Sequence, residues 1–288
     1  MSIVIEHLNY VYMQGGPYET RALDDVSLTI HDGEFIGLIG HTGSGKSTLV
    51  QHLNGLILPT SGKITVDGMD LAEKGTDRRA IRRRVGLVFQ YPENQLFEET
   101  VAKDIAFGPK NLGLGEEEID RRVRTAMRRV ALDYDKLAQR SVFELSGGQM
   151  RRVAIAGVLA MEPQTLVLDE PCAGLDPRGR EEILGLISDL HRESGATIVM
   201  VSHSMEEIAS NVDRLIVMEK GTAVMTDAPS EVFSHAAELV SMGLNVPCMT
   251  QVLLRLQQLG VNVPASAYTV EQAADLLEPL LKGGAQIC

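Results

Sequence analysis

The sequence contains no tryptophan and only three cysteines among its 288 residues. The cysteines Cys172, Cys248 and Cys288 are odd in number and far apart, and no two of them form a Cys-x-x-Cys pair. This distribution indicates neither a disulfide framework nor a zinc site. It is typical of reduced thiols in a cytosolic protein.

Long apolar runs and a basic excess are also missing. No uncharged stretch reaches the roughly 18 apolar residues that a membrane-spanning helix needs, and the interruption at Glu6 favours a first strand over a signal peptide. The chain has 27 Lys and Arg against 39 Asp and Glu, a net charge of −12. This acidic balance argues against nucleic acid as a partner, because nucleic-acid-binding domains usually carry a basic excess.

Short apolar runs with β-branched residues alternate with segments of helical spacing. The runs of strand length are 35–39, 85–89, 165–168, 197–201 and 214–218. Strands that alternate with helices predict an α/β domain around a largely parallel central sheet. The strand-like pattern of the first 35 residues adds a β subdomain, which we expect to be antiparallel.

From about residue 94 to 158 the strand signals disappear and helical patterns replace them. In 116–132 the apolar residues share one helix face, with acidic residues in the first turn and arginines after them, which suits the helix dipole. The five arginines within 121–129 are interpreted as a solvated helix face rather than a nucleic-acid patch, because no aromatic residues interleave with them. A tail follows from about residue 229, and its last predicted helix begins after a Thr269-x-x-Gln272 capping box.

Residues 40–47, GHTGSGKS, match the phosphate-binding pattern G-x-x-x-x-G-K-[ST] between a predicted strand and a predicted helix. In that setting backbone N–H groups and the helix N-terminus face phosphates. Lys46 is expected to reach the β- and γ-phosphates, and the Ser47 hydroxyl to coordinate Mg²⁺. The alternative is a glycine-rich turn with no ligand. The residues expected to bind ATP in this loop are Gly40, His41, Thr42, Gly43, Ser44, Gly45, Lys46, Ser47 and Thr48.

The strand at 165–168 leads into Asp169 and Glu170. Asp169 is expected to face the hydration shell of Mg²⁺, and Glu170 stands where a carboxylate could polarise the attacking water. An Asp-Glu pair at a strand end is common, so this prediction depends on the phosphate loop in the same chain.

The segment ELSGGQMRRVAIAGVLAMEP at 144–163, followed by VLDEP, resembles the signature and Walker B region of ABC-type ATPases. The resemblance covers residues 1–228, where it implies a P-loop ATPase cassette with an inserted helical subdomain at about 94–158. Residues 229–288 would be a helical C-terminal extension. The family's signature, here Ser146, Gly147, Gly148 and Gln149, contacts the γ-phosphate of ATP held by a partner subunit. One phosphate loop and one signature per chain therefore imply two half-sites that close when two chains meet.

The same resemblance assigns roles to three more residues. Gln90, at the end of VGLVFQ, resembles the glutamine that senses Mg²⁺ and the attacking water, and His203 resembles the switch histidine at the γ-phosphate. Asp176 resembles the aspartate of a loop that crosses the dimer interface. Without the family context, Gln90 would be interpreted as a capped strand end, His203 as a structural histidine and Asp176 as the start of a helix. The resemblance thus implies Glu170, His203, Lys46 and Gln90 as catalytic residues and Ser47, Gln90 and Asp169 at the metal.

Two positions match the pattern of the ABC ATPase family less closely. Tyr12 resembles the aromatic residue that stacks on adenine, with Tyr10 or Tyr18 as alternatives. Cys172 stands where the family usually has threonine. Because the neighbouring carboxylates are intact, we expect a competent hydrolytic site.

Two features indicate the type of ABC ATPase. The absence of a long inserted coiled coil argues against a repair ATPase. The presence of one cassette rather than two argues against a translation factor, so a transporter motor is favoured. The segment QYPENQLFEETV at 90–101 and the signature region are similar to energy-coupling factor and cobalt-type transporter ATPases, above all to the second ATPase of the vitamin-importing module. The resemblance implies ATP hydrolysis that drives uptake of vitamins or other micronutrients. The alternatives are a cobalt or nickel importer motor and a soluble non-transport ABC ATPase.

The resemblance also implies partners. In that family the segment Gln90–Phe97, which we call the docking segment, faces a groove for the membrane scaffold protein, and a separate membrane subunit binds the solute. Helices at 246–282 would contact a second ATPase, for which a sister subunit is favoured and another copy of this chain is the alternative. The protein is then expected at the cytoplasmic face of the bacterial cell membrane. The alternatives are a docking segment that only packs on the helical subdomain and a tail that is an ordinary amphipathic cap.

Overall fold

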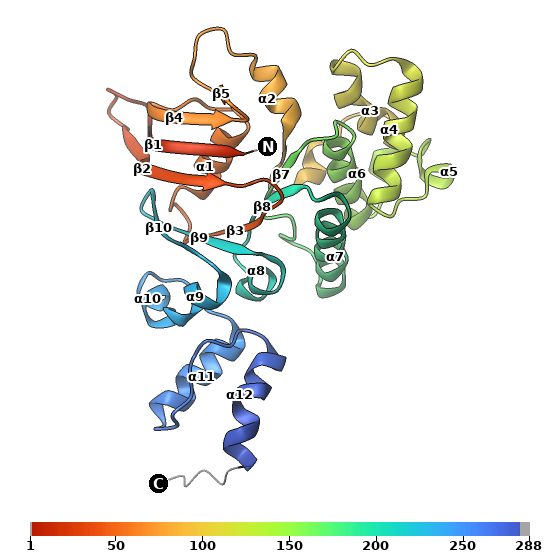
Figure 1. Cartoon of the computed structure of the whole chain (residues 1–288). Helices are drawn as coiled ribbons and strands as arrows, with labels where there is room; N and C mark the ends of the chain where they lie inside the picture. Colours follow the sequence, from red (N-terminus) through yellow and green to blue (C-terminus); the bar gives the residue numbers. More distant parts are fainter. Residues whose placement is uncertain (1, 283–288) are drawn as a thin grey trace.

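The computed structural model describes residues 2–282, which form two sheets with helices around them (Figure 1). The smaller sheet is antiparallel, with strand order β2-β1-β4-β5. Its strands are β1 (Ile3–Tyr12), β2 (Thr20–Ile30), β4 (Ser61–Val66) and β5 (Met69–Asp70). The β-rich start of the chain is therefore an antiparallel unit, as expected.

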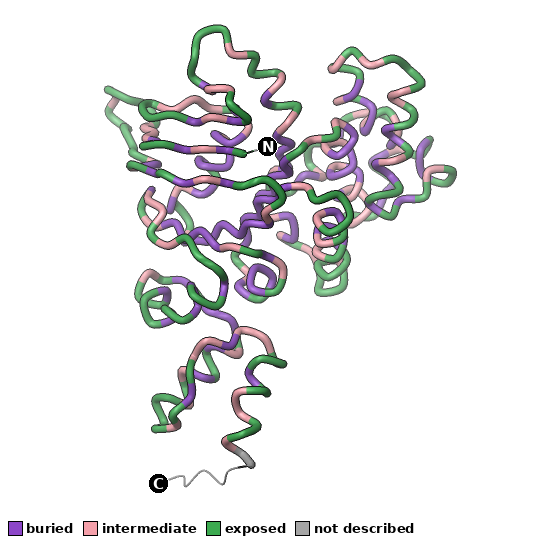
Figure 2. The backbone as a smooth tube through the Cα atoms, in the orientation of Figure 1, coloured by how far each residue is buried: buried purple, intermediate pink, exposed green. Residues whose placement is uncertain are grey.

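The larger sheet has the order β10-β9-β3-β8-β7-β6, and all pairs are parallel except that of β10 with β9. Every residue of β3, β6, β7 and β8 is buried, and Figure 2 shows this burial at the centre of the molecule. Continuous apolar strands arise because both faces of the sheet are covered. The predicted α/β fold is confirmed. The strands are β3 (Phe35–Ile39), β6 (Val85–Val88), β7 (Thr165–Asp169), β8 (Thr197–Val201), β9 (Arg214–Glu219) and β10 (Thr222–Asp227).

Helices fall into two groups before the tail. Those that connect strands of the two sheets are α1 (Lys46–Leu53), α2 (Arg78–Arg84), α7 (Pro177–Ser194) and α8 (Met205–Asn211). The second group lies between β6 and β7, and all of its elements are helical. They are η1 (Pro92–Gln95), α3 (Val101–Asn111), α4 (Glu116–Arg129), α5 (Tyr134–Leu137), η2 (Val142–Glu144) and α6 (Gly147–Leu159). Figure 1 shows this group to one side of the sheets.

The arginines of α4 do not all face solvent, so the interpretation of a solvated face is wrong for Arg122. Its side chain is buried and pairs with Glu118 at 2.7 Å and with Glu162 at 2.9 Å. It also donates to the carbonyl oxygens of Ala160 and Met161, just after α6. Two carboxylates and two carbonyls satisfy the guanidinium, which permits its burial.

The tail contains α9 (Pro229–Ser234), α10 (Ala236–Ser241), α11 (Cys248–Gln258) and α12 (Val270–Lys282). Side chains of α9 and α10 belong to the main core, whereas α11 and α12 enclose a small cluster around Leu253 and Ala273. Thr269 and Gln272 exchange the two hydrogen bonds of the predicted capping box. Cys288 and the end of the predicted extension lie outside the described residues. Within residues 2–282, no helix has the length and apolarity to cross a membrane.

Candidate functional site

The phosphate loop joins β3 to α1, and Gly43 and Gly45 are among the positions where its backbone requires glycine. Gly43 and Gly45 have φ angles of 83° and 102°, values that residues with a Cβ rarely adopt. A Cβ on Gly45 would also stand 2.6 Å from the carbonyl oxygen of Ala22. The glycines therefore let the loop turn tightly into the first turn of α1, whose N–H groups have no partner within the helix.

Lys46 and Ser44 give the interior of this loop its polar character. The buried Lys46 ammonium donates to the carbonyl oxygens of Gly40 (2.6 Å) and His41 (2.9 Å). Burial lowers the pKa of Lys46. The negative charges of Glu170 and Asp169 raise it, but their effect is smaller than that of burial. The Ser44 hydroxyl is buried without a hydrogen-bond partner in the described structure. A buried hydroxyl without a partner is costly, and a phosphate oxygen in the loop would supply one.

Ser47 and Asp169 lie together where Mg²⁺ is expected. Burial raises the pKa of the Asp169 carboxyl above its usual value, and the neighbouring Ser47 side chain opposes this rise. A hydroxyl and a carboxylate are hard oxygen ligands of the kind that Mg²⁺ uses beside phosphates and water. The pair therefore fits the metal that the sequence predicts.

Glu170 follows the middle one of three neighbouring strands and contacts a residue that follows each of the other two. Its Oε2 accepts a hydrogen bond of 2.8 Å from Gln90 Nε2, and its Oε1 lies 2.8 Å from His203 Nε2. Gln90, Glu170 and His203 follow the parallel neighbours β6, β7 and β8, so their side chains meet at the carboxyl edge of the sheet. Glu170 has a φ of 51°, rare for a residue other than glycine. The three residues predicted to organise water and phosphate are thus in contact.

A hollow of about 260 Å³ adjoins Glu170 and His203, and two residues that sequence reasoning missed line it. Arg180 pairs with the buried Glu207 at 3.2 Å, and no signal in the sequence singled them out. Cys172 also lines the hollow, but its side chain is buried, and burial raises the pKa of the thiol to about 12. Cys172, which stands where the family usually has threonine, therefore places a small, protonated thiol beside this hollow.

Tyr12 lies beside the start of α1, with its hydroxyl 3.2 Å from Thr48 Oγ1. Its ring meets Tyr10 edge to face at 4.7 Å, and Tyr10 in turn meets the buried His52 at 4.8 Å. Tyr12 is 38% exposed. Tyr18 lies in the turn between β1 and β2 and is 78% exposed. Of the three tyrosines, Tyr12 is both accessible and joined to a residue of the phosphate-binding segment.

The signature begins α6. Ser146 is its N-cap, accepting from the Gln149 N–H at 3.3 Å, and Gln149 Oε1 accepts from the Ser146 N–H at 3.1 Å. A Cβ on Gly147 or Gly148 would have no heavy atom within 4 Å, so the surface is open there. Asp176 likewise caps α7, accepting from the Gly179 N–H at 2.9 Å. The structure thus shows a helix-capping role for Ser146 and Asp176.

The docking segment presents aromatic rings outward and a carboxylate inward. Phe97, 57% exposed, meets Phe107 of α3 edge to face at 4.9 Å, and Phe107 is 43% exposed. Glu93 instead turns toward the protein and pairs with Arg151 at 2.7 Å. Sequence reasoning had not identified Phe107 or Arg151, because their partners are distant in the chain.

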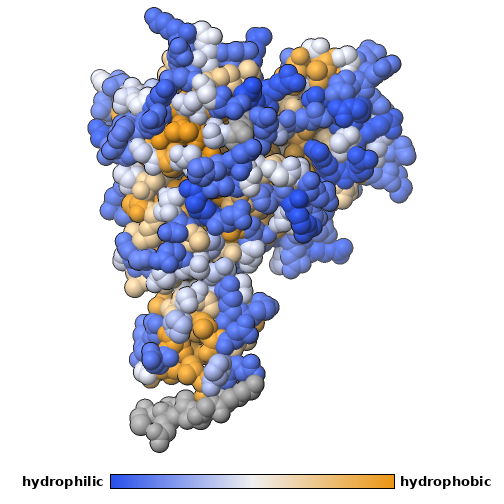
Figure 3. Space-filling view, viewed as in Figure 1, coloured by the Kyte–Doolittle hydropathy of each residue, from blue (hydrophilic) through white to orange (hydrophobic). Residues whose placement is uncertain are grey.

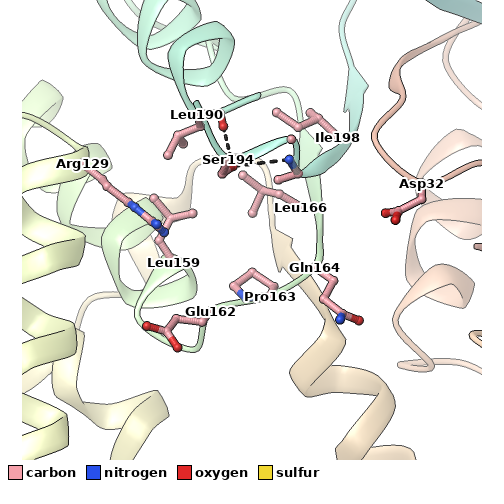
Figure 4. Close-up of a pocket in the computed structure, with 12 residues that line it drawn as sticks. Asp32, Arg129, Leu159, Glu162, Pro163, Gln164, Leu166, Leu190, Ser194 and Ile198 are labelled. Carbon is pink, nitrogen blue, oxygen red and sulfur yellow. Dashed lines mark hydrogen bonds between the residues drawn. The ribbon is translucent and has the colours of Figure 1, made fainter. Parts of the chain in front are cut away.

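A separate pocket of about 420 Å³ lies at the opposite, amino-terminal edge of the central sheet (Figure 4). Arg129, Glu162 and Asp32 stand around it, with apolar side chains such as Leu166 and Ile198 between them. None of the predicted site residues lines this pocket. It is therefore distinct from the site at the carboxyl edge.

Known proteins share this sequence and architecture. The family model described as ABC transporter matches residues 23–173. The energy-coupling factor transporter ATP-binding protein EcfA2 of Clostridium tetani is 56% identical over all of both chains, and EcfA2 of Symbiobacterium thermophilum is 53% identical over 98% of each. Among solved structures, cbiO1 from Clostridium perfringens, part of the ABC transporter complex cbiONQ, has a TM-score of 0.73 at 40% identity and covers 90% of this chain and 96% of its own.

A second solved structure is an ATP-binding cassette, a dimer in a post-hydrolysis state with ADP and Pi bound. Its TM-score is 0.70 at 29% identity, covering 79% of this chain and 98% of its own. Sequence and structure therefore agree on the ABC ATPase cassette, and the sequence relatives specify the transporter type. This chain belongs to the ABC transporter family and, within it, to the ATP-binding subunits of energy-coupling factor transporters.

Proposed function

We propose that the chain binds Mg-ATP in its phosphate loop, closes on a second ATPase subunit, and hydrolyses the nucleotide with Glu170 as the base that polarises water. The convergence of Gln90 and His203 on the two oxygens of Glu170 carries this proposal. Hydrolysis would drive uptake of a vitamin or other micronutrient through the membrane subunits of an energy-coupling factor importer.

Each residue of the site has a role that its position supports. Glu170 holds the attacking water and takes its proton, while Gln90 and His203 fix the direction of the carboxylate. Lys46 would exchange its bonds to the loop carbonyls for bonds to phosphate oxygens and neutralise part of their charge. The chemistry then depends mainly on positioning and on charge stabilisation.

Mg²⁺ would be held by Ser47 and Asp169, with Gln90 at the side of the attacking water. When bound, the ion neutralises charge on the phosphates. Asp169 lies at the end of a fully buried strand, which holds its carboxylate in place. Ser47, on the first turn of α1, approaches it from the phosphate loop.

A second subunit is needed because the signature and the phosphate loop of one chain belong to separate parts of the fold. Ser146 and the two glycines after it begin a helix of the helical group, whereas the loop follows a strand of the central sheet (Figure 1). The open surface at Gly147 and Gly148 leaves room for the phosphates of ATP held by the partner. Asp176 would lie at the same interface.

Exposed apolar surfaces support the proposed partners. Tyr91, Phe97 and Phe107 would receive the scaffold protein, since exposed aromatic residues are favoured at interfaces. Figure 3 shows apolar side chains gathered over α11 and α12, and Val252 and Leu259 are exposed there. This face would meet a sister ATPase. The solute-binding subunit is then contacted only through the scaffold, and the protein sits peripherally on the cytoplasmic face of the membrane.

Glu170→Gln tests the catalytic assignment. The amide keeps the size of the carboxylate but has one acceptor oxygen instead of two and cannot take a proton, so hydrolysis should fall by ~100-fold or more while ATP binding is retained. Turnover is measured on the transporter complex, and binding by equilibrium titration. Wild-type turnover by Glu170→Gln would refute the role of Glu170.

Phe97→Asp tests the docking surface. A charge at this apolar contact should reduce recovery of the membrane subunits with the tagged ATPase. Phe143→Asp is the matched control, because Phe143 is also an exposed phenylalanine of the helical group (69%, against 57% for Phe97) and lies outside the docking segment. Wild-type recovery with Phe97→Asp would show that the scaffold binds elsewhere.

A further inference from the structure

Arg151 joins three parts of the site that are far apart in sequence. It lies on α6, five residues after Ser146, and only 2% of its side chain is exposed. Through Nε and Nη2 it donates to the two carboxylate oxygens of Glu93, at 3.0 and 2.7 Å. Through Nη1 it donates to the carbonyl oxygens of Pro171 (3.0 Å) and Ala173 (2.7 Å). One guanidinium therefore holds the signature helix, the docking segment and the loop after Glu170.

The geometry of these contacts makes the junction stiff. A guanidinium paired with a carboxylate through two parallel hydrogen bonds fixes both the distance and the orientation of the two groups. Burial makes separation costly, because each charge would be left without its partner in a poorly solvated place. Pro92, which begins η1 next to Glu93, is also buried. The docking segment thus cannot shift relative to α6 without breaking the pair.

We propose that Arg151 is a positioning residue through which the docking segment, the signature helix and the loop after Glu170 move as one unit. The proposal rests on the proposed function, in which the docking segment meets the scaffold and the signature meets the partner's ATP. Closure on ATP draws α6 toward the partner, and Arg151 carries Glu93 and the docking segment with it. The same residue places the backbone that leads from Glu170 to Asp176.

The test compares Glu93→Gln and Arg151→Lys in the complete transporter complex. The amide of Glu93→Gln keeps its size but loses the charge, and the lysine keeps its charge but lacks the two-pronged geometry. The measured quantity is ATP turnover in the complex divided by turnover of the isolated pair of ATPase subunits. We expect each variant to lower this ratio about tenfold, within the usual range of coupling between sites. The double variant should be no worse than Arg151→Lys alone, because that variant has already lost the two-pronged pairing with Glu93.

Arg122→Lys is the matched control. Arg122 is buried and, like Arg151, is held by carboxylate and backbone carbonyl oxygens, although its carboxylates come from two residues rather than one. It makes no described contact with the docking segment. Its variant should keep the ratio within about twofold of wild type. A ratio unchanged in Glu93→Gln and Arg151→Lys would overturn the proposal. An equal loss in Arg122→Lys would also overturn it, because general destabilisation would then explain the effect.

Co-purification separates this inference from the docking proposal. If the scaffold does not bind the docking segment, Phe97→Asp leaves the complex intact, and the proposed function fails at that point. If Phe97→Asp releases the scaffold but Arg151→Lys keeps a normal ratio, the docking surface stands and the role of Arg151 is refuted. Each variant carries the same tag and is purified in the same way, so the two outcomes can be compared directly.

Discussion

His203 Nε2 lies 2.8 Å from Glu170 Oε1, although 33 residues separate them in the sequence. Both residues line the hollow beside the strand ends. Removing the contact with His203→Ala should lower ATP turnover by ~100-fold while ATP affinity changes little, because the histidine acts on the reacting groups. His31→Ala, an exposed histidine before β3 at the other edge of the sheet, is the control. Comparable losses in both variants would argue against a specific role for His203.

Ser146 allows capping and phosphate binding to be separated. Asparagine and aspartate both replace serine well as N-caps, so Ser146→Asn and Ser146→Asp should unfold at nearly the same temperature as wild type. The aspartate adds a negative charge where the partner's γ-phosphate is proposed to lie. ATP-driven association of two subunits, followed by light scattering, should therefore be lost in Ser146→Asp and largely kept in Ser146→Asn. Normal association of Ser146→Asp would contradict the cross-subunit role.

Tyr12 should contribute to ATP affinity through its ring. Tyr12→Ala should weaken ATP binding about tenfold, in the range of aromatic stacking on a base, whereas Tyr12→Phe should retain most affinity and lose only the contact with Thr48. Tyr18→Ala should have no effect, since this tyrosine is exposed in the turn before β2. Fluorescent nucleotide titration measures all three. A loss in Tyr18→Ala in place of Tyr12→Ala would reassign the adenine contact.

Cys172 should be inert to alkylation in the folded protein. Its pKa is raised to about 12, so the reactive thiolate forms only as the pH rises toward that value. In a Cys288→Ser background, iodoacetamide at pH 8 should modify the exposed Cys248 and leave Cys172 untouched until denaturant is added. Mass spectrometry of peptides gives the occupancy of each site. Equal modification of both cysteines at pH 8 would show that Cys172 is accessible.

Much of the molecule was determined by local patterns in the sequence. The phosphate loop requires Gly43 and Gly45 at positive φ, and both stand in a recognisable motif. Buried strands such as β7 and β8 are continuous apolar runs in the sequence. The capping-box residues Thr269 and Gln272 mark the start of α12. These features depend on backbone conformation and on neighbours a few residues away, so a linear pattern records them.

Contacts between distant segments were decided only by the tertiary structure. Arg122 and Arg151 look like the other arginines next to them in the sequence, yet each is buried because carboxylates and carbonyl oxygens from other elements satisfy its guanidinium. Glu93 appeared to be part of an outward docking motif, but the fold turns it inward. The sequence by itself determined the fold class and which residues could handle ATP. The packing of parallel strands and of α6 decided which of them touch Glu170 and which segments are tied together.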